Sequence, residues 1–412
     1  MTHLVGLLLG TEEDWPRAFE QLTARLGTFE WRGGTHELAT ERVLNEPFDL
    51  RYRARYSLVL DRVGWWYMLP REWLKKIALM DDVYLLNNPF TFQSMEKHSA
   101  YCAMMRLGLK VPDTWLIPHK QPPWNERFPT TAARYNQPFD LADIGNRVGF
   151  PLYLKPFDGG QWRGVTRARD EDSLRRRYDE SGEQLMHVQS AVEDFEVFTR
   201  SLSIGPETMV MWFDPARPLH DRYQVRHDFL TPEQGDEVVT ISRTVNAFFR
   251  WEFNSCETII KDGVVYPIDY ANASPDVALT SLHYYFPWAI KTLVKWVAFC
   301  VVTDRPMRLN QNTRDYFAIG DRDDLAYEER LPEYRKLADA YFQIEAYDEF
   351  CAEAVAAVDE IAREWFASGD FDELLVRVVR ATFPPHEHDE MVARHRGLVG
   401  QWVREQLSVA AP

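Results

Sequence analysis

The sequence has 412 residues, of which 45% are hydrophobic and 14% aromatic, so it can bury more than one core and is predicted to be globular. Its formal net charge of −16 and the lack of a basic tract exclude general nucleic-acid binding, because phosphates would be repelled. The four cysteines lack metal-ligand spacing, the first residues do not form a signal peptide, and the apolar runs are too short for a membrane span. We therefore expect a soluble cytoplasmic protein with reduced thiols and no membrane partner.

The first part of the chain has the pattern of an α/β domain. Leu4–Leu9 is a continuous apolar run, which is typical of a buried parallel strand. A helix is predicted next, because four apolar residues follow at helical spacing: Trp15, Phe19, Leu22 and Leu26. Tyr56–Val63 and Val83–Leu86 repeat the strand pattern, with a helix predicted at Glu72–Met80 between them.

The centre of the chain combines a lysine with a glycine-rich loop. A helix predicted from about Ser94 to Leu107 carries Lys97 near its start. Farther on, the short buried strand Leu152–Leu154 leads to Lys155, and Pro156 ends it. The loop after it contains Gly159, Gly160 and Gly164. Glycines let backbone N–H groups approach a polyphosphate, and an ammonium group at a strand end adds a charge for the same anion.

Strands are predicted to follow, and helices after them. The strand pattern begins at Glu196 and continues at Met209–Phe213, Asp221–Arg226, Val238–Ile241 and Thr258–Ile260. Lys261-Asp262-Gly263 is predicted to be the turn of a hairpin whose second strand is Val264–Ile268. After Pro287 the pattern is helical, with one apolar face that contains Phe350, Ala354, Val358, Ile361 and Trp365.

Several motifs stand in a distinctive order. Asn87-Asn88-Pro89 comes first, then Met95-Glu96-Lys97, then Gly108-Leu109-Lys110-Val111-Pro112-Asp113-Thr114. Lys155 with its glycine loop, the stretch Met186–Glu196, and the side chains Glu257, Asp269 and Asn272 come later. Together they resemble the ATP-grasp superfamily, and the resemblance runs from about Tyr84 to Pro275.

The resemblance implies an α/β (α+β) fold class with four parts in sequence. Residues 1–90 would form an N-terminal α/β domain, and residues 91–185 a first ATP-grasp subdomain with the phosphate loop. Residues 186–287 would form a second subdomain with the metal ligands, the two subdomains containing antiparallel sheets. Residues 288–412 would be a helical extension that caps the cleft, sets substrate length or forms a homodimer.

The resemblance also implies how ATP would be bound. Lys97 and Lys155 would approach the phosphates, with Gly159 and Gly160 in the loop that covers them. Gln189 and Val192 would lie at the adenine edge, and Glu196 would take the ribose hydroxyls. Gln189 replaces a commoner acidic residue, which leaves the nucleobase preference open.

Glu257, Asp269 and Asn272 are the candidate metal ligands. Glu257 lies six residues before Gly263 and Asp269 six after it, so one hairpin would bring the two carboxylates together. They would repel each other unless a cation lay between them, and oxygen ligands suit Mg²⁺ or Mn²⁺. The spacing from Asp269 to Asn272 is three, whereas family members usually have two, which keeps both side chains on one strand face. We expect a bulge at Tyr270-Ala271 to correct this.

Arginines complete the candidate site. The resemblance makes Arg250 a candidate catalytic residue that holds the acyl phosphate and the tetrahedral intermediate, and Arg226 is a second candidate because its predicted strand would face the phosphates. Arg163, Arg222 and Arg243 compete for these roles.

The implied reaction is an ADP-forming ligation of a small-molecule carboxylate to an amine, or to a thiol, through an acyl phosphate. Two alternatives remain open: phosphoryl transfer to a hydroxyl group, and a nucleotide-binding regulator without catalysis. The acceptor cannot be read from the residues.

Overall fold

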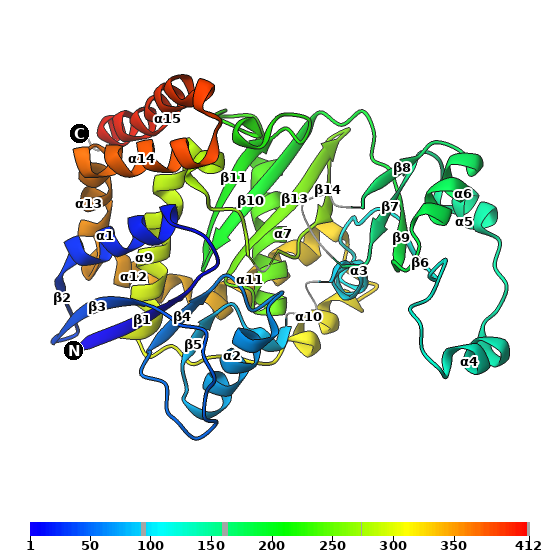
Figure 1. Cartoon of the computed structure of the whole chain (residues 1–412), viewed down its shortest axis with the longest axis horizontal. Coiled ribbons are helices and arrows are strands. Elements are labelled where there is room, and N and C mark those ends of the chain that lie inside the picture. Colours follow the sequence, from blue (N-terminus) through cyan, green and yellow to red (C-terminus); the bar gives the residue numbers. More distant parts are fainter. Residues whose placement is uncertain (92–95, 159–163, 273, 410–412) are drawn as a thin grey trace. The chain divides into compact units, whose positions relative to one another are not determined.

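The computed structural model describes residues 1–91, 96–158, 164–272 and 274–409. These residues form two compact units (Figure 1). Unit 1 comprises Met1–Phe92, Thr199–Ser255 and Ala273–Pro412, and unit 2 comprises Gln93–Phe198 and Cys256–Asn272. The four consecutive domains expected from the sequence stay a prediction.

Unit 1 begins with a mainly parallel sheet. Its strands are β1 (Thr2–Leu8), β2 (Thr28–Trp31), β3 (Gly34–Arg42), β4 (Leu58–Asp61) and β5 (Tyr84–Leu86), in the order β2-β3-β1-β4-β5. β1 is parallel to β3 and β4, β4 is parallel to β5, and only β2 is antiparallel to its neighbour. The buried parallel strand expected at the N-terminus is confirmed as β1. The hairpin β2–β3 has no counterpart among the expected elements: β2 is only four residues long, and β3 contains a single buried residue.

Helices of unit 1 complete this part of the structure. α1 (Asp14–Leu26) buries Trp15, Phe19 and Leu22 at the predicted helical spacing, and α2 (Met68–Met80) precedes β5. The C-terminal region is helical, as expected. Its helices are α8 (Leu279–Leu282), η3 (His283–Tyr285), α9 (Phe286–Val302), α10 (Thr313–Gly320), α11 (Tyr327–Phe342), α12 (Ile344–Glu353), α13 (Ala357–Phe366), α14 (Gly369–Thr382), η4 (Pro385–Glu387) and α15 (His388–Val409). In Figure 1 the blue helix α1 lies against the orange helix α13.

One predicted strand is in fact part of a long helix. Val238–Ile241 lies within α7 (Pro232–Phe249), which begins with a capping box of Thr231 and Gln234. Three of its four β-favouring residues, Val238, Thr240 and Ile241, are buried in the helix, so tertiary packing outweighs their strand propensity. The neighbouring strands are β10 (Val197–Ile204), β11 (Glu207–Phe213) and β12 (Tyr223–Gln224), which follows the short helix η2 (Leu219–Asp221). They belong to a five-stranded sheet of order β12-β11-β10-β13-β14.

The stretch Leu279–Val302 is long and apolar enough to cross a membrane, with a mean hydropathy of 1.3. However, 78% of its most apolar window is buried inside the protein. The core helices of folded domains pass the same test, and α9 packs against α1 and α13 within unit 1. We therefore describe it as a core helix.

A buried ion pair joins the N-terminal sheet of unit 1 to its C-terminal helices. The Arg305 guanidinium lies 3.1 Å from a carboxylate oxygen of Glu252, and both side chains are almost fully buried. The hydroxyl groups of Tyr84 on β5 and Tyr341 on α11 also donate hydrogen bonds to this carboxylate, at 2.7 and 2.6 Å. Tyr84 lies on β5 and Tyr341 on α11, while Glu252 and Arg305 lie in connecting segments, so the cluster fixes how these parts of unit 1 pack.

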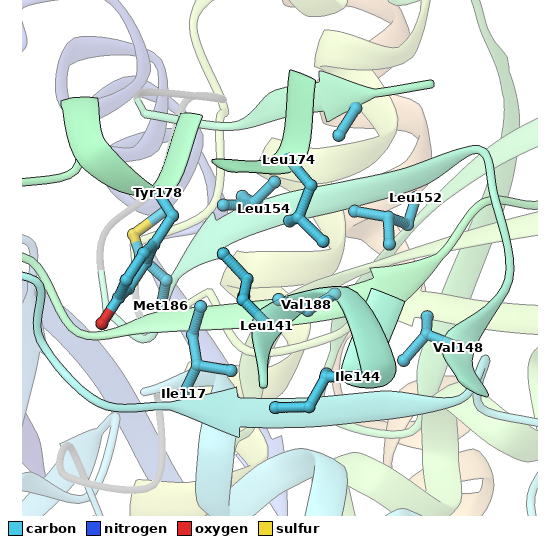
Figure 2. Packing of buried hydrophobic residues seen from close by; sticks show 11 residues of the cluster. Ile117, Leu141, Ile144, Val148, Leu152, Leu154, Leu174, Tyr178, Met186 and Val188 are labelled. Carbon is cyan, nitrogen blue, oxygen red and sulfur yellow. The ribbon is translucent and has the colours of Figure 1, made fainter. Parts of the chain in front are cut away.

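Unit 2 contains a four-stranded antiparallel sheet of order β6-β9-β7-β8. The strands are β6 (Thr114–Ile117), β7 (Leu152–Pro156), β8 (Thr166–Ala168) and β9 (Met186–Ser190), and the helices are α3 (Lys97–Arg106), α4 (Phe128–Tyr135), α5 (Leu141–Val148) and α6 (Glu171–Glu180). Figure 2 shows the core that α5 and α6 form with this sheet, in which Leu152 and Leu154 of β7 meet Leu174 and Val188. This side of the sheet is apolar, so the alternate residues of β7, Tyr153 and Lys155, are left for its other face.

Candidate functional site

The hairpin predicted to hold the metal ligands is present, and from Cys256 onward it belongs to unit 2. It consists of β13 (Phe253–Lys261) and β14 (Val264–Asp269). The turn between them has positive φ at both central residues, 50° at Asp262 and 74° at Gly263. An Asp-Gly pair favours this type I′ geometry, whose twist matches that of the strands. The local sequence therefore determines where the hairpin turns.

A β-bulge decides which residues of the hairpin face each other. From the turn, the pairing runs evenly as far as Thr258 opposite Pro267. The next pair is Glu257 opposite Asp269, so one step on β13 corresponds to two on β14, and Ile268 is the extra residue. Without it, Glu257 would face Ile268. The bulge expected at Tyr270-Ala271 is thus wrong in position: it lies at Ile268, and β14 ends at Asp269.

Helix α3 contacts this end of β14 with two residues one turn apart. The Tyr101 hydroxyl donates a hydrogen bond of 3.0 Å to the carbonyl oxygen of Ile268, the bulged residue. Lys97 Nζ lies 2.8 Å from Asp269 Oδ2. Residues four apart lie on the same helix face, so one face of α3 holds both the backbone of Ile268 and the carboxylate of Asp269.

Lys97 is a buried cation. Its side chain is 9% exposed, and its backbone N–H donates to the carbonyl of Phe157. Burial opposes its charged form, but the negative charges of Asp269 and Glu257 outweigh burial and raise the pKa of Lys97 above its ordinary value. Lys97 is therefore an ammonium ion throughout the neutral range.

Lys155 lies on β7 in a different environment. Its Nζ donates a hydrogen bond of 2.6 Å to Gln189 Oε1, and Gln189 Nε2 donates in turn to the Thr114 hydroxyl at 2.7 Å. Burial lowers the pKa of Lys155 to about 8, against a smaller opposite effect of Asp269. Its hydrogen-bond partner is a neutral amide, so burial lowers the pKa of Lys155, whereas the neighbouring carboxylates raise the pKa of Lys97.

A pair of histidines lies beside the two lysines. His98 follows Lys97 on α3, and His187 is directly opposite Lys155 in the β7–β9 pairing. His98 Nδ1 and His187 Nε2 are 3.2 Å apart, and the two rings are stacked. Burial first, and the nearby His98 and lysines second, lower the pKa of His187 to about 4. The pair is thus neutral at His187 and links the segments that carry Lys97 and Lys155.

The other candidates in unit 2 lie at the surface or partly buried. Glu196 is exposed, and its carboxylate accepts a hydrogen bond of 2.9 Å from the backbone N–H of Asp262 in the hairpin turn. Val192 is partly buried just after β9, and Asn272 is partly buried three residues beyond the end of β14. Gly159 and Gly160 lie outside the described residues.

The two candidate catalytic arginines belong to unit 1. Arg226 is exposed and stacks over the ring of Trp212, with Cζ 4.0 Å from the ring centroid. Arg250 is buried at the C-terminal end of α7, where its guanidinium donates to the carbonyl groups of Ala247 and Asn310 at 2.8 and 3.0 Å. These hydrogen bonds satisfy donors of the Arg250 guanidinium group that burial removes from water.

The comparisons with known proteins agree on one fold. No family model matches the sequence, and neither does any curated protein. Among solved structures, a D-alanine–D-alanine ligase from Bacillus anthracis matches with a TM-score of 0.50 and 14% identity, covering 74% of this chain and 99% of that one. D-alanyl-alanine synthetase A from Vibrio cholerae matches with a TM-score of 0.50 and 12% identity, covering 73% and 98%. A RimK domain ATP-grasp protein from Sphaerobacter thermophilus matches with a TM-score of 0.49 and 13% identity, covering 73% and 99%.

The chain has the ATP-grasp fold. At identities this low the likeness concerns the fold alone, and the expected fold class is confirmed. It adds no evidence on individual side chains, so the residue roles within this ATP-grasp fold rest on the geometry described above.

Four residues near this site were not among the candidates: Tyr101, Thr114, His98 and His187. The spacing of four between Lys97 and Tyr101 was visible in the predicted helix and could have indicated that Tyr101 shares the face of Lys97. Thr114 is the last residue of the motif Gly108–Thr114, but its contact with Gln189 is distant in sequence. His98 and His187 also meet across a long separation, and no local pattern marks them.

The donor set fits a hard divalent cation. Glu257 and Asp269 present carboxylate oxygens from opposite strands, and Lys97 already supplies a positive charge to Asp269. Within the described ranges, no group of three or more histidine, cysteine, aspartate or glutamate side chains is placed to hold a metal ion. Two carboxylates are too few for a closed protein site, so the remaining oxygen ligands of a cation here would come from Asn272, water or a bound phosphate.

Proposed function

We propose that this chain is an ATP-dependent ligase that joins a carboxylate substrate to an amine and releases ADP and phosphate. The observation that supports this most strongly is the charge cluster in unit 2, in which Lys97 pairs with Asp269, Asp269 faces Glu257, and Lys155 lies within reach of their charges. Buried lysines and carboxylates of this kind are the groups that phosphoryl transfer requires.

Lys97 and Lys155 are the proposed phosphate ligands. The chain carries a net charge of −16, so a triphosphate needs local cations to bind. Gln189, fixed between Lys155 and Thr114, and Val192 would contact the adenine, while Glu196 would contact the ribose. Gly159 and Gly160 would cover the phosphates.

Glu257, Asp269 and Asn272 are the proposed ligands of Mg²⁺ or Mn²⁺. The bound ion would supply neutralisation of the charge on the transferred phosphoryl group. The side chains of Glu257 and Asp269 would place their oxygen atoms on one face of the hairpin end. The bulge at Ile268 allows this, because it brings Asp269 opposite Glu257.

The proposed reaction has two steps. A carboxylate oxygen of the substrate attacks the γ-phosphorus of ATP, the bond to the bridging oxygen breaks, and ADP leaves. The amine then attacks the acyl carbon, phosphate leaves with the electron pair of the C–O bond, and the amine loses a proton. Arg250 and Arg226 are the proposed catalytic arginines: Arg250 is buried among carbonyl groups, and Arg226 is exposed.

The test is an ADP-release assay with Mg²⁺-ATP and pools of amino acids and small carboxylates, in the presence of hydroxylamine. A ligase gives substrate-dependent ADP together with a hydroxamate, since hydroxylamine traps the acyl phosphate. Substrate-dependent ADP release without a hydroxamate would contradict the ligase and favour phosphoryl transfer to a hydroxyl group. If no pool gives substrate-dependent ADP release, the proposal is contradicted. ATP binding by such a chain would then favour a nucleotide-binding regulator.

Two variants locate the activity. Lys155→Met and Asp269→Asn should each abolish substrate-dependent ADP release. Lys120→Met is the matched control, because Lys120 is also a lysine of unit 2 but is exposed and pairs with Asp179 at the surface. If Lys155→Met and Lys120→Met behaved alike, the proposed site would be wrong.

A further inference from the structure

The cation that Asp269 contacts in this structure belongs to the protein itself. Lys97 Nζ lies 2.8 Å from Asp269 Oδ2, and Asp269 is directly opposite Glu257. Glu257 is 9% exposed and Lys97 is 8% exposed, so water screens their charges poorly. Glu257 also acts electrostatically on Lys97, together with Asp269. The ammonium group of Lys97 thus contacts Asp269 directly and is attracted by the charge of Glu257 as well.

We infer that Lys97 is a resident counter-ion that occupies the place of the divalent cation until a nucleotide binds. The inference rests on the proposed function, because it concerns the proposed metal ligands. A divalent cation and an ammonium group would compete for the same two carboxylates, and like charges at this distance repel. The metal ion therefore binds this pair only when Lys97 has moved to another anion.

The phosphates of a nucleotide provide that anion. Lys97 is the first residue of α3, and its long side chain extends from the helix end, so rotation of the side chain can redirect its ammonium group without moving the helix. Tyr101 holds the same helix to Ile268 and keeps α3 in place during the exchange. Metal binding without nucleotide is consequently weak, and the site avoids holding a bare metal ion.

Lys155 provides the internal comparison. It is also a lysine near the same carboxylates, but its hydrogen bond goes to Gln189 Oε1. It therefore adds positive charge to the region without occupying the carboxylate oxygens. Removing the charge of Lys97 should favour metal binding much more than removing the charge of Lys155.

The experiment titrates the full chain with Mn²⁺ alone, without nucleotide, and follows the paramagnetic resonance signal of free Mn²⁺. Lys97→Met should bind Mn²⁺ roughly 5- to 150-fold more tightly than the unchanged chain, which is the usual range of a coupling between two ligands. Lys97→Arg keeps the charge and should bind Mn²⁺ as weakly as the unchanged chain. If Lys97→Met does not fold, Lys97→Gln carries the same expectation, because its neutral amide can still donate to Asp269.

Equal Mn²⁺ affinity in Lys97→Met and the unchanged chain would overturn the inference, as would an equal gain in Lys155→Met. Asp269→Asn in the Lys97→Met background should remove the gained affinity, and a gain that survived it would also overturn the inference. ADP release is scored separately. If the unchanged chain releases ADP but Lys97→Met binds Mn²⁺ no more tightly, the counter-ion role of Lys97 is refuted and the proposed ligase activity stands. If Lys97→Met binds Mn²⁺ more tightly but the unchanged chain releases no ADP, the proposed ligase activity is refuted and the counter-ion role stands.

Discussion

Asp269 lies directly opposite Glu257 across the β13–β14 hairpin, although even pairing from the turn would place Ile268 there. The extra residue on β14 moves Asp269 to the face that Glu257 occupies. The Tyr101 hydroxyl bonds to the carbonyl of Ile268, so a contact from helix α3 supports this arrangement. The geometry of the candidate metal site therefore depends on a bulge that a residue outside the hairpin holds.

Tyr101→Phe should weaken both stability and the site. Loss of one buried hydrogen bond lowers the free energy of unfolding by about 1 kcal/mol. The bulge then loses its support, so Mg²⁺-dependent ADP release should fall by roughly tenfold, corresponding to a misplacement of the proposed ligands. Urea unfolding and the ADP assay measure the two effects.

Tyr178→Phe is the control for this prediction, because its hydroxyl also donates to a backbone carbonyl in unit 2, that of Pro118 at 3.0 Å. It should lose similar stability and keep its activity. Equal activity losses in the two variants would show that Tyr101 has no special relation to the site.

The affinity for ATP should fall as the pH rises through about 8. Burial lowers the pKa of Lys155 to about 8, so above this pH the side chain becomes neutral and no longer attracts phosphate. Gln189→Glu places a carboxylate beside Lys155, which raises its pKa and moves the loss of affinity to higher pH. Lys155→Arg stays charged and should show no such decline. Equilibrium binding of ATP between pH 7 and 10 tests this, and identical profiles for all three chains would refute it.

Acid should destabilise the fold through His187. Its pKa is lowered from 6.5 to about 4 by burial, so the unfolded chain binds the proton more tightly than the folded chain. The contribution of His187 to the free energy of unfolding, about 3 kcal/mol, is fully present above pH 6.5 and is lost as the pH falls towards 4.

His187→Gln should flatten this part of the pH profile of the free energy of unfolding, because glutamine does not titrate. His386→Gln changes an exposed histidine and should leave the profile as it is. A profile that stays equally steep in His187→Gln would exclude His187 as its cause.

Breaking the buried pair of Glu252 and Arg305 should be the most destabilising single change among those considered. Arg305→Met leaves the Glu252 carboxylate buried without its cation, and this costs about 3–5 kcal/mol of unfolding free energy. The double variant Glu252→Gln with Arg305→Met should lose less than the sum of the single changes, because no lone charge remains.

The exposed pair of Arg32 and Glu349 provides the comparison in the same unit. Arg32→Met should cost at most about 1 kcal/mol, since water screens that pair. Equal losses at Arg32 and Arg305 in urea unfolding would contradict the role assigned to the buried cluster.

Local sequence determined the elements whose cause is local. The Asp262-Gly263 pair gives the hairpin turn because both residues accept positive φ, and β7 ends at Pro156, the proline expected to end it. The order of the motifs was sufficient to predict the ATP-grasp fold. A continuous apolar run was sufficient to predict β1, and the helical spacing of apolar residues was sufficient to predict α1.

Tertiary structure decided the rest. Residues 238–241 favour a strand by propensity, but they form part of helix α7 because its buried face packs on other elements of unit 1. The hydrogen bond of Tyr101 to Ile268 and the ion pair of Lys97 with Asp269 join segments about 170 residues apart in sequence, which a pattern of neighbouring residues cannot encode. The sequence thus determined which residues carry the charges, and only the packing of α3 against the hairpin end decided which of these charges meet.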